Sequence, residues 1–313
     1  MYRRSLGICI SLVLGISIVA AANESASQAH LSAADIAAKN VTARGGLEAW
    51  RAVQTMSLEG KLGAGGNQRA SLPIAPPGRR STLQIVPPRP AEEVQLPFVM
   101  ELKRPRKLRF ELQFNDQTAI QVFDGVNGWK VRPFLNRLVV EPYTPDEMRI
   151  ASAQADLDGP LIDYAVKGTR VELAGMEKVE GRDTYKLKLA MKNGQAIDVW
   201  IDAETFLEAK IEGQPRRLDG IEHPVEVYFR DYRTVNGLQI PYVLETKVLP
   251  VAQTALKSTD TPVPTEKISI EKVLVNPNLE ESRFSKPQVG GAASGKSITG
   301  ANLTNLAAQP RQN

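Results

Sequence analysis

Few residues in this chain have the types and spacing that covalent catalysis requires. The histidines are His30 and His223, and neither is accompanied by a serine or cysteine motif such as a nucleophile elbow. His223 stands directly before Pro224, where we interpret it as a turn residue. The sequence therefore predicts no catalytic triad, and we expect this protein not to be an enzyme.

Acidic residues leave one catalytic alternative open. Asp198, Asp202 and Glu204 flank a predicted turn, where carboxylates are most simply solvated. Glycoside hydrolysis needs only a pair of suitably separated carboxyl groups, and such a pair has no sequence motif. A hydrolase of this kind remains an open alternative that no motif favours.

Patterns that bind metals or cofactors are equally sparse. The only cysteine is Cys9, and the two histidines lack the spacing of metal ligands. Residues 156–159 (Asp-Leu-Asp-Gly) resemble the start of a calcium loop, but its twelfth position is Lys167 instead of an acidic ligand. We interpret these residues as a helix end, and we expect no metal and no cofactor.

Residues 1–22 have the composition of a Sec-type signal peptide. Arg3 and Arg4 provide the positive start, residues 6–19 form an apolar core, and the alanines at 20–22 form a cleavage site. The apolar core is shorter than the ~20 residues of a membrane span. We therefore expect export and cleavage near Ala22, with an uncleaved anchor as the alternative. The mature chain would contain no cysteine and would depend on an ordinary hydrophobic core.

The charge of the chain is unremarkable for a soluble exported protein. Its formal net charge is +4, and the loss of Arg3 and Arg4 would lower it further. Proteins that bind nucleic acid usually carry a strong basic patch or stripe. We therefore expect no nucleic acid among the partners.

Capping patterns predict helices in two places. Ser32 and Asp35 form a capping box that begins an N-terminal helix, which residues 45–46 (Gly-Gly) end. Residues 144–147 (Thr-Pro-Asp-Glu) combine an N-cap, a proline at the first helical position and a glutamate at the third. Residues 158–160 interrupt that helix, and a second helical segment over 161–166 is predicted to end at Gly168. The sequence thus predicts two short helices inserted among strands.

Period-two alternation predicts a mainly β fold around these helices. Residues 107–114 alternate charged or polar with apolar side chains, which is typical of a strand with one polar face and one buried face. Asn-Gly pairs at 193–194 and 236–237 predict tight hairpins between further strands. We expect roughly ten strands in one large curved antiparallel sheet, because sheets of that size curl or close.

Two segments are expected to lie outside the sheet. Residues 63–97 are rich in glycine and contain seven prolines, which exclude a central strand, so we interpret them as a long loop. Residues 287–313 have many small residues and few large apolar ones, which predicts a disordered tail.

The segment 101–134 carries a resemblance to a known family. Its residues are Lys103-Arg104-Pro105, then Leu108-x-Phe110, then Asp124-Gly125-x-x-x-Trp129 and Pro133-Phe134. This series resembles the periplasmic lipoprotein carriers of the LolA/LolB type and the wider set of outer-membrane lipoprotein-sorting proteins. The order of predicted elements over about 31–286 is similar to that family too.

The resemblance implies a fold and a function. The fold would be a half-open β-barrel with an N-terminal helix and a two-helix lid, formed by residues 23–286 as a single domain. The protein would be a periplasmic carrier of lipid or lipoprotein acyl chains, with inner- or outer-membrane transfer proteins as further partners. The alternative is an envelope sensor or interaction protein that uses the same fold to bind a protein partner without lipid transfer.

The resemblance also implies site residues. Arg104 matches an arginine that hydrogen-bonds the lid backbone and acts as a latch, although a surface residue before a proline is an equal interpretation. Leu108 and Phe110 match apolar cavity positions, and alternation places two further side chains of the same strand on their face. The predicted ligand-binding residues are apolar, and they are Leu108, Phe110, Leu112, Phe114, Trp129, Met148 and Ile162.

Overall fold

The computed structural model describes residues 31–65, 93–133, 137–218, 221–251 and 265–288. The described residues from Ser32 onward belong to one compact unit. The predicted signal peptide lies outside the described residues, and so do positions 66–92 of the predicted loop and 289–313 of the predicted tail. No helix among the described residues is long and apolar enough to cross a membrane.

The helices begin where the capping patterns place them. Ser32 and Asp35 form the predicted capping box at the start of α1, and Thr144 and Glu147 form the second one at the start of α3. Both predictions are confirmed, because a capping box is decided by residues within one helical turn. The helices are α1 (Ala33–Ala43), α2 (Leu47–Ala52), α3 (Pro145–Gln154) and the short 3₁₀ helix η2 (Glu281–Phe284).

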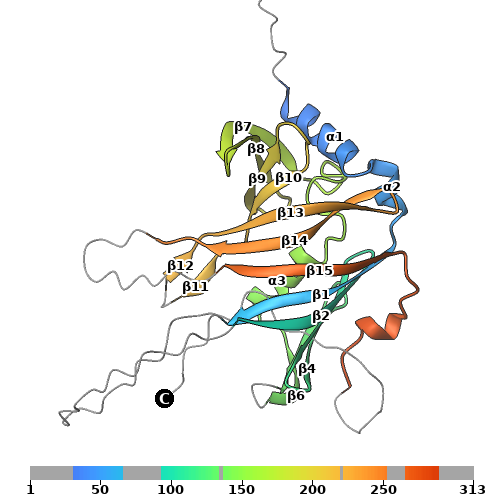
Figure 1. Cartoon of the computed structure of the whole chain (residues 1–313). Coiled ribbons are helices and arrows are strands. Elements are labelled where there is room, and N and C mark those ends of the chain that lie inside the picture. The colour runs from blue at the N-terminus through green and yellow to red at the C-terminus, as the bar shows by residue number, and fades with distance from the viewer. Residues whose placement is uncertain (1–30, 66–92, 134–136, 219–220, 252–264, 289–313) are drawn as a thin grey trace, which may run out of the picture. The chain divides into compact units, whose positions relative to one another are not determined.

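The strands form one large antiparallel sheet that does not close. Thirteen strands pair in the order β6-β5-β4-β3-β2-β1-β15-β14-β13-β10-β9-β8-β7, and β11 pairs with β12 in a separate ribbon. Figure 1 shows β13, β14, β15, β1 and β2 side by side across the centre of this sheet. The strands are β1 (Thr55–Gly65), β2 (Glu93–Lys103), β3 (Lys107–Phe114), β4 (Gln117–Phe123), β5 (Gly128–Arg132), β6 (Arg137–Pro142), β7 (Arg170–Val179), β8 (Arg182–Ala190), β9 (Ala196–Asp202), β10 (Glu208–Glu212), β11 (Arg216–Leu218), β12 (Ile221–His223), β13 (Val225–Val235), β14 (Leu238–Val248) and β15 (Glu266–Val275).

The prediction of one large antiparallel sheet is confirmed, but the predicted number of strands was too low. The two edge strands β6 and β7 are mostly exposed on both faces, with Val139 63% and Met176 57% exposed. A strand that buries neither face has no reason to alternate apolar and polar side chains. Period-two analysis is therefore least sensitive at the edges of a sheet.

The predicted loop over 63–97 included residues that belong to strands. Strand β1 continues to Gly65, and β2 begins at Glu93 with Pro97 inside it, opposite Lys61 of β1. Pairing between β2 and β3 is first seen at Phe98, opposite Leu112. Pro97 thus lies where its missing N–H removes no bond of the β2–β3 ladder, which is the position that sheets tolerate.

The second inserted helix is not formed. Residues 161–168 make a series of turns, and Gly159 and Asp163 both have left-handed backbone angles, with φ of 77° and 52°. This path buries the consecutive side chains of Leu161 and Ile162 completely. Tertiary packing has therefore overridden the local helical preference, and α3 is the only helix of the predicted pair.

The face of β3 that was predicted to be polar and wet is covered. Glu111 on that face is only 2% exposed, and the segment around η2 packs against it. Arg283 of η2 donates to Glu101 over 2.6 Å and also approaches Glu111. The covering segment comes from the far end of the chain, so alternation within β3 does not reveal it.

Ion pairs and one aromatic ring fix this C-terminal segment. Hydrogen bonds from Lys103 and Lys107 lower the pKa of Glu281 to about 2. Phe284 beside them is 1% exposed. The face of β2 and β3 that η2 covers is thus part of the folded core.

Truncation of Phe284 should test the contribution of this cover. We expect Phe284→Ala to lower the free energy of unfolding by about 3–5 kcal/mol, the usual cost of removing a buried phenylalanine ring. Urea denaturation followed by tryptophan fluorescence measures the loss. Phe114→Ala, which removes the same ring from a site 36% exposed, should cost clearly less. Equal losses in the two variants would contradict the packing described.

Candidate functional site

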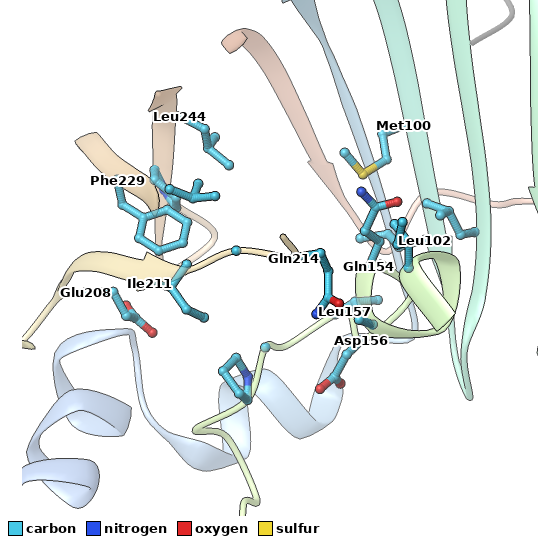
Figure 2. Close-up of a pocket in the computed structure, with 18 of the residues that line it drawn as sticks. Met100, Leu102, Gln154, Asp156, Leu157, Glu208, Ile211, Gln214, Phe229 and Leu244 are labelled. Carbon is cyan, nitrogen blue, oxygen red and sulfur yellow. The ribbon is translucent and has the colours of Figure 1, made fainter. Parts of the chain in front are cut away.

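A cavity of about 570 Å³ lies between one face of the sheet and the segment that contains α3. We call this the inner face of the sheet. Figure 2 shows Phe229, Ile211 and Leu244 on one side of the cavity, with Met100 and Leu102 on the other. Most of the wall is apolar; its members include Met56, Leu58, Phe98, Met100, Leu102, Leu108, Phe110, Ile150, Leu157, Val199, Ile211, Val227, Phe229, Ile240, Leu244, Ile268 and Ile270.

Strand register explains why these side chains share one face. Residues directly opposite each other in an antiparallel pair project to the same side. Met100 on β2 lies opposite Phe110 on β3, and Leu102 lies opposite Leu108. The rings of Phe98 and Phe110 stack with their centroids 5.5 Å apart. The N-terminal half of the sheet thereby contributes a continuous apolar wall.

The predicted ligand-binding residues of β3 fall into two groups. Leu108 and Phe110 line the cavity. Leu112 is buried in the same hydrophobic core but is not part of the cavity wall. Phe114 is partly exposed at the end of β3 and is not part of the wall either.

The other predicted residues lie outside the wall. Trp129 on β5 is opposite Val122 of β4, whereas Gln121 of β4 is opposite Phe110, so Trp129 projects to the outer face. Met148 packs against the core from α3. Ile162 is fully buried in the same core.

Sequence reasoning missed the half of the wall that strands β9–β14 provide. Val227 and Phe229 of β13 line the cavity, and so do Ile240 and Leu244 of β14. The Asn-Gly pair at 236–237 did predict the hairpin that these two strands form. Nothing local indicates that they meet the residues of β2 and β3, because that contact depends on the order of strands across the sheet.

A buried ion pair holds α3 against the inner face. The Lys130 ammonium on β5 donates to the Glu147 carboxylate over 2.6 Å, and both side chains are buried. Glu147 also accepts from the backbone N–H of Thr144 in the capping box. The same carboxylate thus caps the N-terminus of the helix and fixes the helix to the sheet. Arg106 adds a hydrogen bond to the Ser152 carbonyl near the other end of α3.

Arg104 joins two segments that border the cavity. Its guanidinium donates to the carbonyls of Val53, over 2.7 Å, and Trp50, over 3.0 Å, next to the end of α2. It also donates to the Asp158 carboxylate, over 2.6 Å, in the segment after α3. The resemblance implies a hydrogen bond from this arginine to lid backbone, and here the segment after α3 is held through a carboxylate.

Asp158 and its neighbours form the most strongly charged part of the site. Lys167 donates to Asp156 over 2.8 Å, to Asp158 over 2.5 Å and to the carbonyl of Gly159 over 2.6 Å. Burial alone would raise the pKa of Asp158, but Lys167 and Arg104 outweigh it and keep that pKa below its usual value. Burial raises the pKa of Asp156.

Lys167 is the residue that takes the twelfth position of the apparent calcium loop. Its ammonium is bound by the carboxylates of Asp156 and Asp158 and by the Gly159 carbonyl. In this loop the positive charge is therefore supplied by a lysine side chain. Among the described residues, no group of three or more His, Cys, Asp or Glu side chains could hold a metal ion. Residues 156–159 directly follow the end of α3, whose last residue is Gln154 and whose C-cap is Ala155.

A second charged group closes the cavity near α2. Arg44 donates to the Asp158 carbonyl over 2.8 Å and forms an ion pair of 3.3 Å with Glu208. The Tyr232 hydroxyl donates to the Glu208 carbonyl over 3.0 Å. The Arg44 guanidinium also stacks 4.3 Å above the Trp50 ring. These wall charges are therefore neutralised by one another.

Comparisons with known proteins give structural relatives but no sequence match. No protein-family model matches the chain, and no curated protein matches its sequence. A LolA superfamily protein from Nitrosomonas europaea is 14% identical, with a TM-score of 0.48 over 82% of this chain and 98% of that chain. A putative outer membrane lipoprotein-sorting protein domain from Vibrio parahaemolyticus is 13% identical, with a TM-score of 0.47 over 82% and 96%.

A third similar structure is a DUF1329 family protein from Desulfovibrio piger, 12% identical with a TM-score of 0.47 over 81% of this chain and 95% of that chain. The family that the sequence resembles is thus among the solved structures to which this chain is similar. Because these TM-scores are below 0.5, we rest the functional proposal on the cavity itself.

The Lys130–Glu147 pair predicts how firmly α3 is held. Lys130→Met leaves a buried carboxylate without its cation and should lower the free energy of unfolding by about 3–5 kcal/mol. Lys130→Met combined with Glu147→Met removes both charges and should cost much less than the single change. Urea denaturation measures both losses.

A matched control is available at an exposed pair. Lys178 and Asp183 form an ion pair of 2.7 Å with both side chains mostly exposed. Lys178→Met should change stability by less than about 1 kcal/mol. A double variant as unstable as Lys130→Met alone would show that the ion pair is not what makes the single change costly.

Proposed function

We propose that this protein binds the acyl chain of a lipid or lipoprotein in the inner-face cavity and carries it within the cell envelope. The observation that carries this proposal is the cavity wall. Apolar side chains from both halves of the sheet and from α3 surround one space of about 570 Å³. Pockets for small ligands span roughly 300–1,000 Å³ and are lined mostly by apolar groups.

The energetics suit an alkyl ligand. Burial of each methylene group gains about 0.8 kcal/mol, so a chain that buries about ten of them gains roughly 8 kcal/mol. Lost translational and rotational freedom opposes this gain by several kcal/mol. The affinity therefore depends on how many methylene groups the cavity buries, and it should rise with the length of the acyl chain.

Location and partners follow from the proposed role. The predicted signal peptide supports export, and a periplasmic carrier would receive and deliver its cargo through inner- or outer-membrane transfer proteins. We propose binding without covalent change of the cargo.

One observation favours a second candidate function. The edge strands β6 and β7 of the open sheet expose apolar side chains, among them Leu138, Val139, Leu173 and Met176. An exposed edge can accept an extended peptide as an additional strand. An envelope sensor or interaction protein that binds a protein partner in this way is therefore the alternative.

Direct extraction tests the main proposal. The full precursor is expressed, and the mature protein is purified from the periplasm without detergent and extracted with organic solvent. Mass spectrometry should identify a near-stoichiometric acyl species. An extract without lipid from folded protein would favour the protein-partner alternative.

A charge placed on the cavity wall should abolish ligand binding. Phe110→Glu puts a carboxylate among apolar side chains, where its desolvation is costly, so we expect at least a tenfold loss of affinity for an apolar fluorescent probe. Phe114→Glu makes the same change on the same strand outside the wall and should retain binding. Circular dichroism checks that both variants fold.

Leu244→Trp provides an uncharged test of the same wall. The larger side chain should fill part of the cavity and reduce the uptake of the probe. Unchanged uptake in Phe110→Glu and in Leu244→Trp would place the ligand elsewhere.

A further inference from the structure

A buried glutamine is among the polar side chains that line the cavity. Gln121 on β4 lies directly between Phe110 of β3 and Lys130 of β5, so these three side chains form a row on the inner face. Gln121 is only 6% exposed, and it lines the cavity. Gln121 lies where the cavity wall ends on β4, next to the phenylalanine, methionine and leucine side chains of β3 and β2. A buried glutamine beside these apolar side chains needs an explanation.

The amide of Gln121 makes no hydrogen bond within the described part of the chain. A glutamine side chain has two donor hydrogens and an acceptor oxygen, and no described residue meets either end of this one with hydrogen-bonding geometry. Its atoms are also not among the sealed, unpaired polar atoms of the described residues, so they face the cavity space. Buried polar groups are normally satisfied, because an unmet one is costly.

Two further amides border the same space. Gln154 at the end of α3 and Gln214 after β10 both line the cavity and are partly buried. Figure 2 shows Gln154 and Gln214 among the side chains that line the cavity. Neither amide has a hydrogen-bonding partner among the described residues. These three glutamines thus offer neutral amides to a ligand in the cavity.

The buried charged side chains near Gln121 are already in ion pairs. Lys130, the cation in the same row as Gln121, is bound to Glu147. Arg44 is paired with Glu208, and Asp156 is paired with Lys167. Among the described residues, the buried charges near Gln121 are thus all paired, so an ionised ligand group buried beside Gln121 would lack a counter-ion of its own, which makes its burial unfavourable.

Cations do border the cavity at its surface. Arg106 and Arg149 are both exposed, and Arg149 is paired with the exposed Asp146. Exposed charges of this kind suit an ionised or strongly hydrated head group that stays in water. The wall therefore has apolar side chains and neutral amides inside, and charges only outside or in closed pairs.

We propose that the cavity recognises an acyl carbonyl, in an ester or an amide linkage, and that the Gln121 amide donates a hydrogen bond to it. This inference rests on the proposed function and names the part of the ligand that the site selects. The carbonyl of an acyl ester or amide is neutral, accepts hydrogen bonds and is joined directly to an alkyl chain. It thus matches an amide donor that is surrounded by apolar side chains.

Two lipids with the same chain length separate this recognition from simple hydrophobic binding. Monopalmitoylglycerol has an ester carbonyl, whereas 1-O-hexadecylglycerol has a methylene group in its place. Each is titrated against the mature protein that holds an apolar fluorescent probe, and displacement gives the affinity. We expect the ester to bind about tenfold more tightly than the ether, which corresponds to about 1.4 kcal/mol.

Two variants of β4 test the role of Gln121. Gln121→Leu keeps the approximate shape but removes the donor, so the ester and the ether should bind equally, at the affinity of the ether for the unchanged protein. Gln117→Leu makes the same substitution at an exposed position of the same strand and should keep the tenfold preference. N-palmitoylserinol, which has an amide carbonyl, shows whether amide-linked chains share the preference.

A stability measurement excludes a purely structural role. An amide without a protein partner contributes nothing to folding through hydrogen bonds, so Gln121→Leu should melt at the same temperature as the unchanged protein or higher. A large decrease would show that the amide serves the fold and would overturn the assignment.

The outcomes distinguish this inference from the proposed function. Equal affinities for the ester and the ether, or a preference that survives Gln121→Leu, would overturn carbonyl recognition and leave acyl binding intact. Failure of both lipids to displace the probe would overturn the proposed acyl carrier together with this inference.

Discussion

The structure depends on the fact that its thirteen-stranded sheet does not close. The inner face of an open sheet is apolar, and it has to be covered by another part of the chain. Here the cover is the insertion between β6 and β7, which consists of α3 and the turns that follow it. That insertion is held by a small number of ion pairs, of which Lys130–Glu147 and Arg104–Asp158 are buried or partly buried. The cavity lies where the cover and the sheet do not fill the space between them.

The ion pairs fix the position of this cover on the sheet but add little net stability to the fold. The Coulombic attraction within a buried pair is largely cancelled by the cost of removing both charges from water. The loss of one partner is nevertheless costly, because it leaves the other charge buried and unpaired. Glu147 and Asp158 therefore resist displacements that would separate them from their cations. The apolar contacts of α3 are different, because an alkyl chain could replace them at similar energy. Fixed polar anchors and exchangeable apolar contacts are the combination that a binding site with a stable frame requires.

Local physics explains which features could be predicted from the sequence. The capping boxes at Ser32 and Thr144 depend on residues within one turn, and the Asn-Gly pair at 236–237 forms its hairpin because both residues adopt positive φ, 50° and 80°. The alternation of β3 predicted that Leu108 and Phe110 share its apolar face, and both are buried in the structure. Each of these features is decided by neighbours in the chain or across one strand pair.

The features that the sequence did not reveal are decided by distant contacts. The turns at 161–168 follow from the burial of Leu161 and Ile162, of which Ile162 is in a core built largely by other parts of the chain. Glu111 is buried by a segment that lies about 170 residues away along the chain. The facing wall of Phe229 and Leu244, and the position of Gln121 between Phe110 and Lys130, require the strand order and register of the whole sheet.

The two faces of the sheet treat their buried polar groups differently. On the outer face, Glu111 is paired with Arg109, and the Trp200 indole donates to Glu177 over 2.7 Å while Lys210 lies 3.8 Å from its ring. Those groups are satisfied by the protein itself, as the interior of a stable fold requires. On the inner face, Lys130 is satisfied in the same way by Glu147, but Gln121 next to it in the row is not. Both faces are built from the same strands, so the sheet itself does not account for the difference. Under the proposed function, the carbonyl group of the bound acyl chain supplies the partner that the Gln121 amide does not find among the described residues.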